Sequence, residues 1–258
     1  MAGEGDTLVA SSDWPEIVRQ IRARTPARLL VGRAGAAYRT GTQMELREAH
    51  AAARDAVRAE LDLETDLGRD FVKQWELFEV CTQARSKDEY VLRPDLGRRF
   101  SDSSRAELLQ HCSSCNHLQI AIGDGLSVSA VSAQVPPLHG ALIEGAKARG
   151  WKVGRTFVIR HCRVGILNEI GELLIPEVAV LLIGERPGLA TAESLSAYMA
   201  YRPRKAHSDA NRNLVSNIHA RGVRPQEAAI RILNLGAQMM KAGTSGCQVR
   251  EELPALER

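Results

Sequence analysis

The sequence predicts an α/β fold: a doubly wound, mostly parallel sheet with helices on both faces, preceded by a mainly helical N-terminal region. After about residue 110, strand-like segments alternate with helical ones. One of these segments, residues 178–183, is apolar throughout, which is typical of a strand buried on both faces of a parallel sheet. Helical signals dominate before residue 110. We therefore expect a helical region over residues 1–110 and an α/β domain over residues 111–258.

The first helix is predicted at the N-terminus. Asp13 is a favoured cap residue, and Pro15 suits the first helical turn. The apolar side chains that follow recur at helical spacing on one face: Trp14, Ile17, Val18 and Ile21. Residues 24–43 are rich in Arg, Gly and Thr and predict a loop.

Two capping boxes predict the next helices. Thr42 with Glu45 starts a helix that we expect to run to about Leu61. Ser104 with Glu107 starts a short helix. The first region is thus expected to be mostly helical, with long connections.

Four segments of the second region are strand-like: residues 118–122, 153–159, 178–183 and 195–201. Pro136 and Pro137 predict the start of a helix that Gly150 closes. Pro225 opens a last helix that we expect to end near Gly243.

Composition excludes several classes of protein. The formal net charge is only +3 and the charges of both signs are mixed, so nucleic acid is not the expected partner. The apolar runs have the length of strands and not of membrane spans, and the first residues carry no apolar secretory core. Five irregularly spaced cysteines favour a reducing cytoplasm over a disulfide scaffold.

Ligands of doubly wound sheets bind beyond the carboxyl ends of the strands, which directs attention to residues 123–127 and 184–189. Gly123 and Gly125 suggest a dinucleotide site, but its third glycine is replaced by Val128, so a tight turn is favoured. A nucleotide- or dinucleotide-binding α/β enzyme that acts alone stays as the alternative function. At the second loop, Glu185 and Arg186 either face solvent or present an acceptor and a cation to a ligand.

Two further motifs have ordinary interpretations that we prefer. Residues 111–117 contain two cysteines and two histidines, but no second ligand pair completes a zinc site, so we expect a surface loop and no metal. Residues 217–222 differ by one residue from D-x-H-x-x-G, the motif of cobalamin-binding domains in which a histidine ligates cobalt. Asn217 stands at the Asp position and supports the imidazole only weakly, so we interpret the match as coincidence.

A resemblance to a known family covers about residues 28–250. The sequence LLIGERPGLATAESLSAY at residues 181–198 closely resembles the small (light) subunit of ethanolamine ammonia-lyase. Further blocks of that family follow the same order along the chain: residues 84–90, 93–99, 124–127 and 213–219.

The resemblance implies a lyase that converts ethanolamine to acetaldehyde and ammonia with adenosylcobalamin. Its radical chemistry starts from homolysis of the cobalt–carbon bond, and the protein supplies position and seclusion. In the family, the large subunit holds ethanolamine in a (β/α)₈ barrel, and the small subunit, a Rossmann-like domain, closes over cobalamin at the subunit interface. The resemblance also implies six copies of each subunit, a cytoplasmic or microcompartment location, an inactive isolated chain and no catalytic residue on it.

Three cobalamin contacts carry over by position: Val164, Glu185 and Val215. Val215 is Cys in some relatives, so only an apolar or backbone contact is expected there. Loop position alone adds four further candidates: Arg163, Arg186, Asp124 and Gly125. Some relatives also use a short N-terminal helix to reach a microcompartment shell, so residues 15–24 are expected either to dock there or to pack within the complex.

Overall fold

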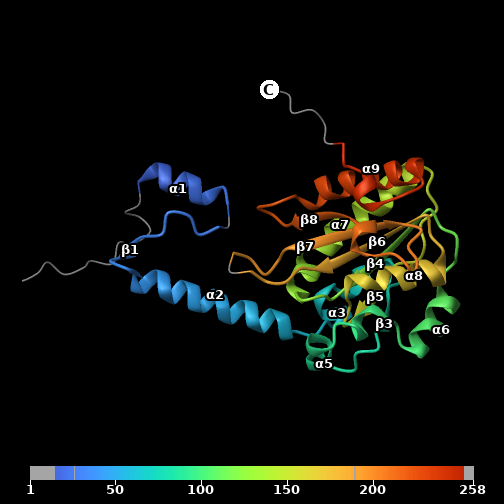
Figure 1. The fold of residues 1–258 in the computed structure, drawn as a ribbon, viewed down its shortest axis with the longest axis horizontal. Coiled ribbons are helices and arrows are strands. Elements are labelled where there is room, and N and C mark those ends of the chain that lie inside the picture. Colours follow the sequence, from blue (N-terminus) through green and yellow to red (C-terminus); the bar gives the residue numbers. More distant parts are fainter. Residues whose placement is uncertain (1–14, 26, 189, 253–258) are drawn as a thin grey trace, which may run out of the picture.

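The computed structural model describes residues 15–25, 27–188 and 190–252. A six-stranded sheet forms its centre, in the order β3-β5-β4-β6-β7-β8 (Figure 1). The strands are β3 (Phe78–Cys81), β4 (Leu118–Gly123), β5 (Phe157–Arg160), β6 (Val178–Gly184), β7 (Leu195–Tyr201) and β8 (Asn213–Ile218). The first four run parallel, whereas β7 and β8 pair antiparallel. The sheet is therefore mixed. In the described residues between β6 and β7, and between β7 and β8, the chain forms no α-helix of the kind that a parallel crossover requires.

The chain reverses its direction of winding at β4. From β4 it passes through α7 (Val128–Ala148) to β5 on one side, and then through α8 (Leu167–Leu174) to β6 on the other side. The two helices pack in different hydrophobic clusters, one on each face of the sheet. A crevice therefore forms beyond the carboxyl end of β4, where ligands of such sheets bind.

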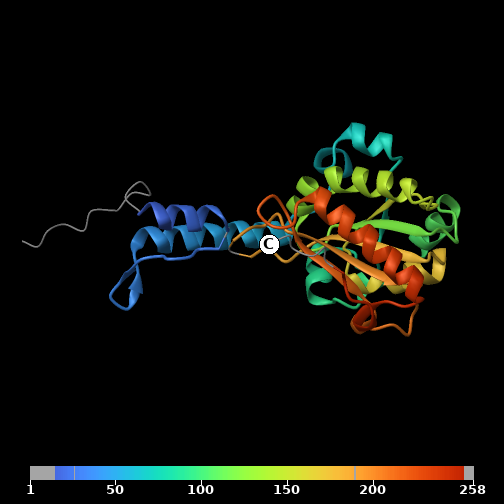
Figure 2. The same ribbon diagram turned by 90° about the horizontal axis from the view of Figure 1, so that it is seen from above.

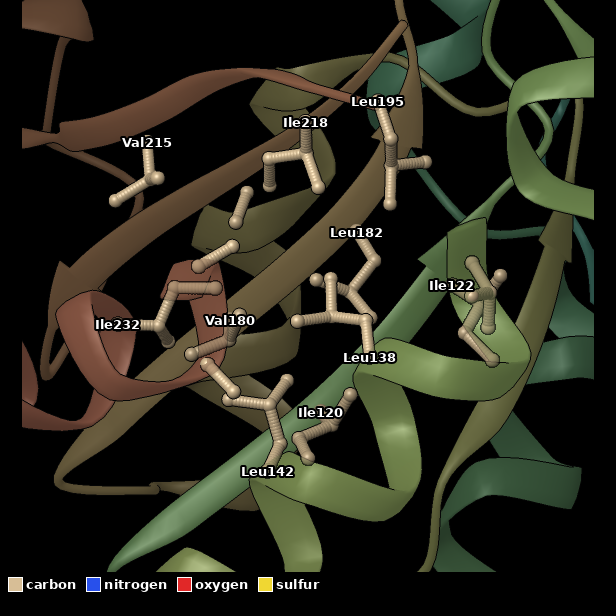
Figure 3. Close-up of a cluster of buried hydrophobic side chains, with 14 of the residues drawn as sticks. Ile120, Ile122, Leu138, Leu142, Val180, Leu182, Leu195, Val215, Ile218 and Ile232 are labelled. Atoms are coloured by element: carbon tan, nitrogen blue, oxygen red, sulfur yellow. The ribbon is translucent and has the colours of Figure 1, made fainter. Parts of the chain in front are cut away.

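Two hydrophobic cores sandwich the sheet. On one face, β4 and β6 pack against α7 and α9 (Pro225–Ala242), and Figure 3 shows residues of this core: Ile120, Ile122, Leu138, Leu142, Val180, Leu182 and Ile232. The intervening strand residues face α8 and α6 (Asp102–His111) on the other side. Burial of each large aliphatic side chain stabilises the fold by roughly 1.5–3 kcal/mol.

The N-terminal elements form an arm that extends from one end of the sheet domain (Figures 1 and 2). It consists of α1 (Glu16–Ala23), the short hairpin β1 (Arg33–Ala34) and β2 (Ala37–Tyr38), and α2 (Thr40–Arg58). Neither α1 nor α2 contains a buried residue. Asp13 and Trp14, expected at the start of α1, lie outside the described residues.

The rest of residues 1–110 packs on the sheet domain. It contains α3 (Leu63–Asp66), α4 (Arg69–Gln74), α5 (Lys87–Leu92), the 3-10 turn η2 (Leu96–Arg98) and most of α6, together with β3 of the central sheet. Three more 3-10 turns follow: η3 (Val164–Ile166), η4 (Asp209–Asn211) and η5 (Gly246–Gln248). The region expected to be helical therefore also supplies an edge strand.

Three predicted helix starts differ from the structure. α7 begins at Val128, where Ser127 accepts a hydrogen bond from the Ala130 amide, and Pro136 and Pro137 lie inside it. The two prolines remove helix hydrogen bonds, but burial along one whole side of α7 compensates for their loss. α6 is capped by Ser101 through the Ser104 amide, not by Ser104. α2 begins two residues before Thr42 with no side-chain cap.

Candidate functional site

Three turns meet at the carboxyl edge of the parallel strands. They follow β4, β5 and β6, and they surround a cavity of about 270 Å³. Its lining comprises Tyr90, Gly125, Leu126, Cys162, Arg163, Val164, Ile183, Gly184, Glu185, Arg186, Ser196, Tyr198, Leu214 and Ser216. A second cavity of about 910 Å³ shares Arg163 and Val164 with the first. The crevice expected from the topology is therefore present.

Glu185 is held in place with one carboxylate oxygen engaged. Its Oε1 accepts hydrogen bonds from Ser196 Oγ at 2.5 Å and from the Asn217 amide at 3.1 Å. Its own amide donates to Ser194 O at 3.0 Å. Within the described residues no donor contacts Oε2, so this oxygen can accept a hydrogen bond from a ligand in the cavity.

Val164 lines the cavity, whereas Val215 does not. Val164 is the last residue of the turn that follows β5 and the first of η3, and it contributes apolar surface to both cavities. Val215 is fully buried in the core between the sheet and its covering helices (Figure 3). Side chains alternate along a strand, so its neighbours Leu214 and Ser216 face the cavity instead.

Of the four candidates chosen by loop position, three line the cavity and one does not. Arg163, Arg186 and Gly125 line the cavity, and Asp124 lies behind it, fully buried. Gly125 has φ +56°, and a Cβ atom there would lie 2.3 Å from Gly184 O. The positive φ and this close approach both require glycine at position 125. They agree with the tight turn that the sequence analysis favoured.

The loop after β8 does not offer an imidazole to a metal. His219 is buried, its Nε2 lies 2.8 Å from Asn217 Oδ1, and its Nδ1 accepts from the Arg221 amide at 3.2 Å. Burial, followed by the charge of Arg221, lowers the pKa of His219. Both ring nitrogens are therefore engaged inside the loop itself.

The cysteine–histidine segment is likewise occupied by local contacts. Cys112 is buried, its thiol donates to Arg155 O at 3.7 Å, and burial raises its pKa to about 11. Cys115 is exposed, and His117 Nδ1 accepts from the Lys152 amide at 2.8 Å. Across the part of the chain that the structure describes, no three His, Cys, Asp or Glu side chains are grouped to hold a metal ion.

The lining of the cavity offers groups that suit the binding of a ligand. It combines aliphatic surface, one carboxylate and two guanidinium groups, and burial raises the pKa of the Cys162 thiol. The lining residues that were not selected singly from the sequence include four that present a hydroxyl or a large apolar side chain: Tyr90, Leu126, Ser196 and Tyr198. All four belong to family blocks, which is the signal that pointed to them.

Fold and site together define an α/β protein with an open ligand cavity at the switch point of its sheet. The sequence profile described as "Ethanolamine ammonia-lyase light chain (EutC)" matches residues 15–250. The chain belongs to this family, and is thus a subunit of a lyase that acts as a two-subunit complex.

Curated relatives agree with this assignment. The chain is 40% identical to the ethanolamine ammonia-lyase small subunit of Clostridium perfringens, over 91% of this chain and 78% of that protein. It is 39% identical to the same subunit of Clostridium acetobutylicum, over 91% of this chain and 95% of that protein. It is 40% identical to the ethanolamine ammonia-lyase small subunit of Clostridioides difficile, over 94% of this chain and 81% of that protein. The family supports the subunit interpretation and not a nucleotide-binding enzyme that acts alone.

Proposed function

We propose that this chain forms one wall of an adenosylcobalamin site and that the large subunit of ethanolamine ammonia-lyase forms the opposite wall and the ethanolamine site. One observation carries the proposal. Val164 and Glu185, two of the three contacts expected from the family, lie far apart in sequence and line one open cavity at the switch point of the sheet. Their apolar and acceptor groups suit a ligand with an apolar ring edge and amide side chains.

The size of the cavity supports a shared site. A corrin ring with its side chains and nucleotide is much larger than the 270 Å³ enclosed here. The chain therefore covers only part of such a ligand, and a second subunit has to enclose the rest. The adjoining 910 Å³ cavity extends the accessible surface past Val164.

Each lining group has a role that its position permits. The free Oε2 of Glu185 accepts a hydrogen bond from a corrin amide, and Val164 with Ile183 offers apolar surface. At the third position, Leu214 and Ser216 supply the side-chain surface, while Val215 holds β8 in the core. When bound, adenosylcobalamin supplies the radical chemistry, and this chain positions the group and excludes water.

The remaining expectations form part of the same proposal. The four parallel strands resemble a Rossmann-like fold, with β4 at the switch point. Assembly with six copies of each subunit and a cytoplasmic location, including a bacterial microcompartment, follow from the family. No helix within the described residues is long and apolar enough to cross a membrane.

The test is cobalamin binding by the assembled enzyme. Glu185→Ala in the complex with the large subunit should weaken hydroxocobalamin binding about ten- to hundred-fold, because a charged hydrogen bond is worth roughly 1.5–3 kcal/mol. Glu144→Ala, an exposed site on α7, serves as the matched control and should bind as the wild type does. Equal affinity in both variants would place Glu185 away from the cofactor.

A further inference from the structure

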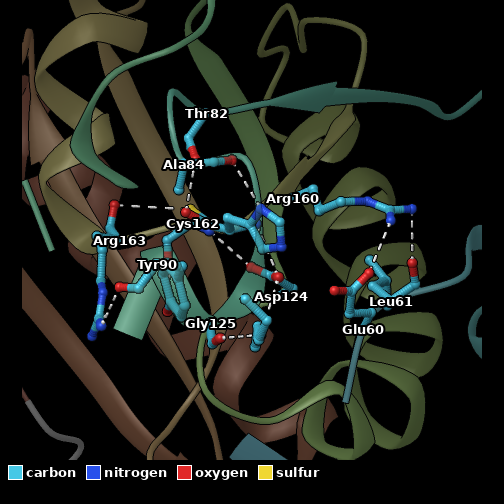
Figure 4. Close-up of polar contacts among 12 residues, drawn as sticks. Glu60, Leu61, Thr82, Ala84, Tyr90, Asp124, Gly125, Arg160, Cys162 and Arg163 are labelled. Carbon is cyan, nitrogen blue, oxygen red and sulfur yellow. Dashed lines mark hydrogen bonds and ion pairs between the residues drawn. The ribbon is translucent and has the colours of Figure 1, made fainter. Parts of the chain in front are cut away.

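Two family blocks, residues 84–90 and 93–99, contribute one side chain, Tyr90, to the lining of the cavity. They form α5 and η2 and lie against the turn that follows β5 (Figure 4). That turn, residues 161–164, carries Arg163 and Val164 to the cavity. The contacts between these segments show what the two blocks do.

A buried carboxylate anchors the turn from the strand side. Asp124 Oδ1 accepts from the Cys162 amide at 2.8 Å, and Oδ2 accepts from the His161 amide at 2.9 Å. Lys87 Nζ lies 3.3 Å from Oδ2 and also donates to Gly125 O at 3.1 Å. The side chains of Lys87 and Asp124 are 7% and 0% exposed. The Lys87–Asp124 pair thus joins α5, the β4 turn and the β5 turn at one point.

α5 and η2 hold the same turn from its outer side. Tyr90 Oη donates to Cys162 O at 3.0 Å, and Arg163 Nη2 donates to Tyr90 O at 3.1 Å. The Arg163 guanidinium lies 4.2 Å from the centre of the Tyr90 ring. The Arg163 amide also donates to Gly97 O at 2.8 Å. The backbone of the turn is therefore held in place, and this sets the positions of the Arg163 and Val164 side chains in the cavity.

We propose that Lys87 and Asp124 are positioning residues: the pair fixes residues 161–164 and so sets the place of Val164 and Arg163 in the cofactor wall. This inference rests on the proposed function of the cavity. Neither residue lines the cavity, and both lie outside the two hydrophobic cores. α5 buries only Lys87 and Tyr90. Tyr90 bonds this turn directly, and Lys87 reaches it through Asp124.

The variants separate positioning from stability. Asp124→Asn or Lys87→Met leaves one buried charge without its partner and should lower the melting temperature. The double variant Lys87→Met/Asp124→Asn has no unpaired charge, so its melting temperature should recover. The carboxamide offers one acceptor oxygen where the carboxylate offers two, so it can accept from only one of the His161 and Cys162 amides, and the affinity for cobalamin should stay low. Lys87→Arg keeps the charge and should restore affinity relative to Lys87→Met.

The experiment titrates hydroxocobalamin into complexes of each variant with the large subunit and measures thermal unfolding in parallel. We expect the double variant to bind about tenfold more weakly than the wild type, which corresponds to about 1.4 kcal/mol, at near wild-type stability. If the double variant does not fold, Thr82→Val provides the test, because Thr82 Oγ1 donates to His161 O at 3.0 Å from the opposite side of the turn. It should also lower affinity.

The two proposals fail in different ways. Wild-type affinity in the stable double variant, or in Thr82→Val where the double variant does not fold, overturns the positioning role if Glu185→Ala still weakens binding. If the affinity of the double variant recovers together with its melting temperature, the Lys87–Asp124 pair only stabilises the fold, and the positioning role is overturned. If Glu185→Ala also binds normally, the assignment of the cavity itself is overturned.

Discussion

At the residue scale, His139 of α7 couples the stability of the fold to pH. Its Nε2 lies 2.9 Å from Thr156 Oγ1, and its ring packs edge-on against Phe71 and Trp75. The residue is 1% exposed, and burial lowers its pKa from 6.5 to about 4. As the pH falls, the imidazole of the unfolded chain is therefore protonated first, while the imidazole of the folded protein stays neutral.

Acid should destabilise the protein through this residue. The unfolded state binds the proton below about pH 6.5, and the folded state binds it only near pH 4. The free energy of unfolding therefore decreases as the pH is lowered from 6.5 to 4. Between pH 7 and pH 5 the loss from His139 should be about 2 kcal/mol. Urea unfolding at the two pH values measures it. His139→Gln should flatten the dependence, and an unchanged slope would contradict this role.

The site residues show what a single sequence can reveal. Glu185 and Val164 were both selected from the family resemblance, by the positions that they match. The loop after the apolar strand also pointed to Glu185, but left open whether it faces solvent or a ligand. Val215 was expected in the cavity but lies one residue from its lining. The face to which a side chain points depends on strand register, which could not be read from a single sequence. The Lys87–Asp124 pair spans 37 positions and has no local pattern.

At the element scale, strong periodicity and long apolar runs were predicted well. β4, β6, β7 and α9 lie where the sequence placed them. β8 was missed because it pairs at the sheet edge and its polar residues mask the pattern, with only Val215 and Ile218 buried. α8 was missed because eight residues between two strands give too short a periodic signal.

The N-terminal helix is separable from the domain. No residue of α1 is buried, and Ile17 and Ile21 are 61% and 38% exposed. Deletion of residues 1–24 should leave the melting temperature of the chain within about 2 °C, because surface changes away from the core usually matter little. A larger drop would show that the helix belongs to the core.

The same deletion distinguishes the two destinations proposed for the helix. A truncated chain that pairs with the large subunit and supports activity, but leaves the microcompartment, indicates docking to the shell. A truncated chain that no longer pairs indicates a place within the complex. An isolated helix of this length is marginal in water, which is the physical reason to expect a surface for it.

At the scale of the whole molecule, the arm and the cavity share one edge of the sheet. Arg160, the last residue of β5, donates to Leu61 O at 3.1 Å and pairs with Glu60, just beyond the end of α2 (Figure 4). The cavity opens beside the turn that begins at the next residue. A partner that covers the cavity therefore approaches the edge from which the arm leaves.

The central claim is that cobalamin binds between two subunits, and the direct measurement is an absorption titration with hydroxocobalamin. It is performed on this chain alone, on the large subunit alone and on the reconstituted complex. The shared site predicts tight, saturable binding by the complex and much weaker binding by either chain, with no ethanolamine turnover by this chain alone in the presence of adenosylcobalamin. Equally tight binding by the large subunit alone would contradict the claim.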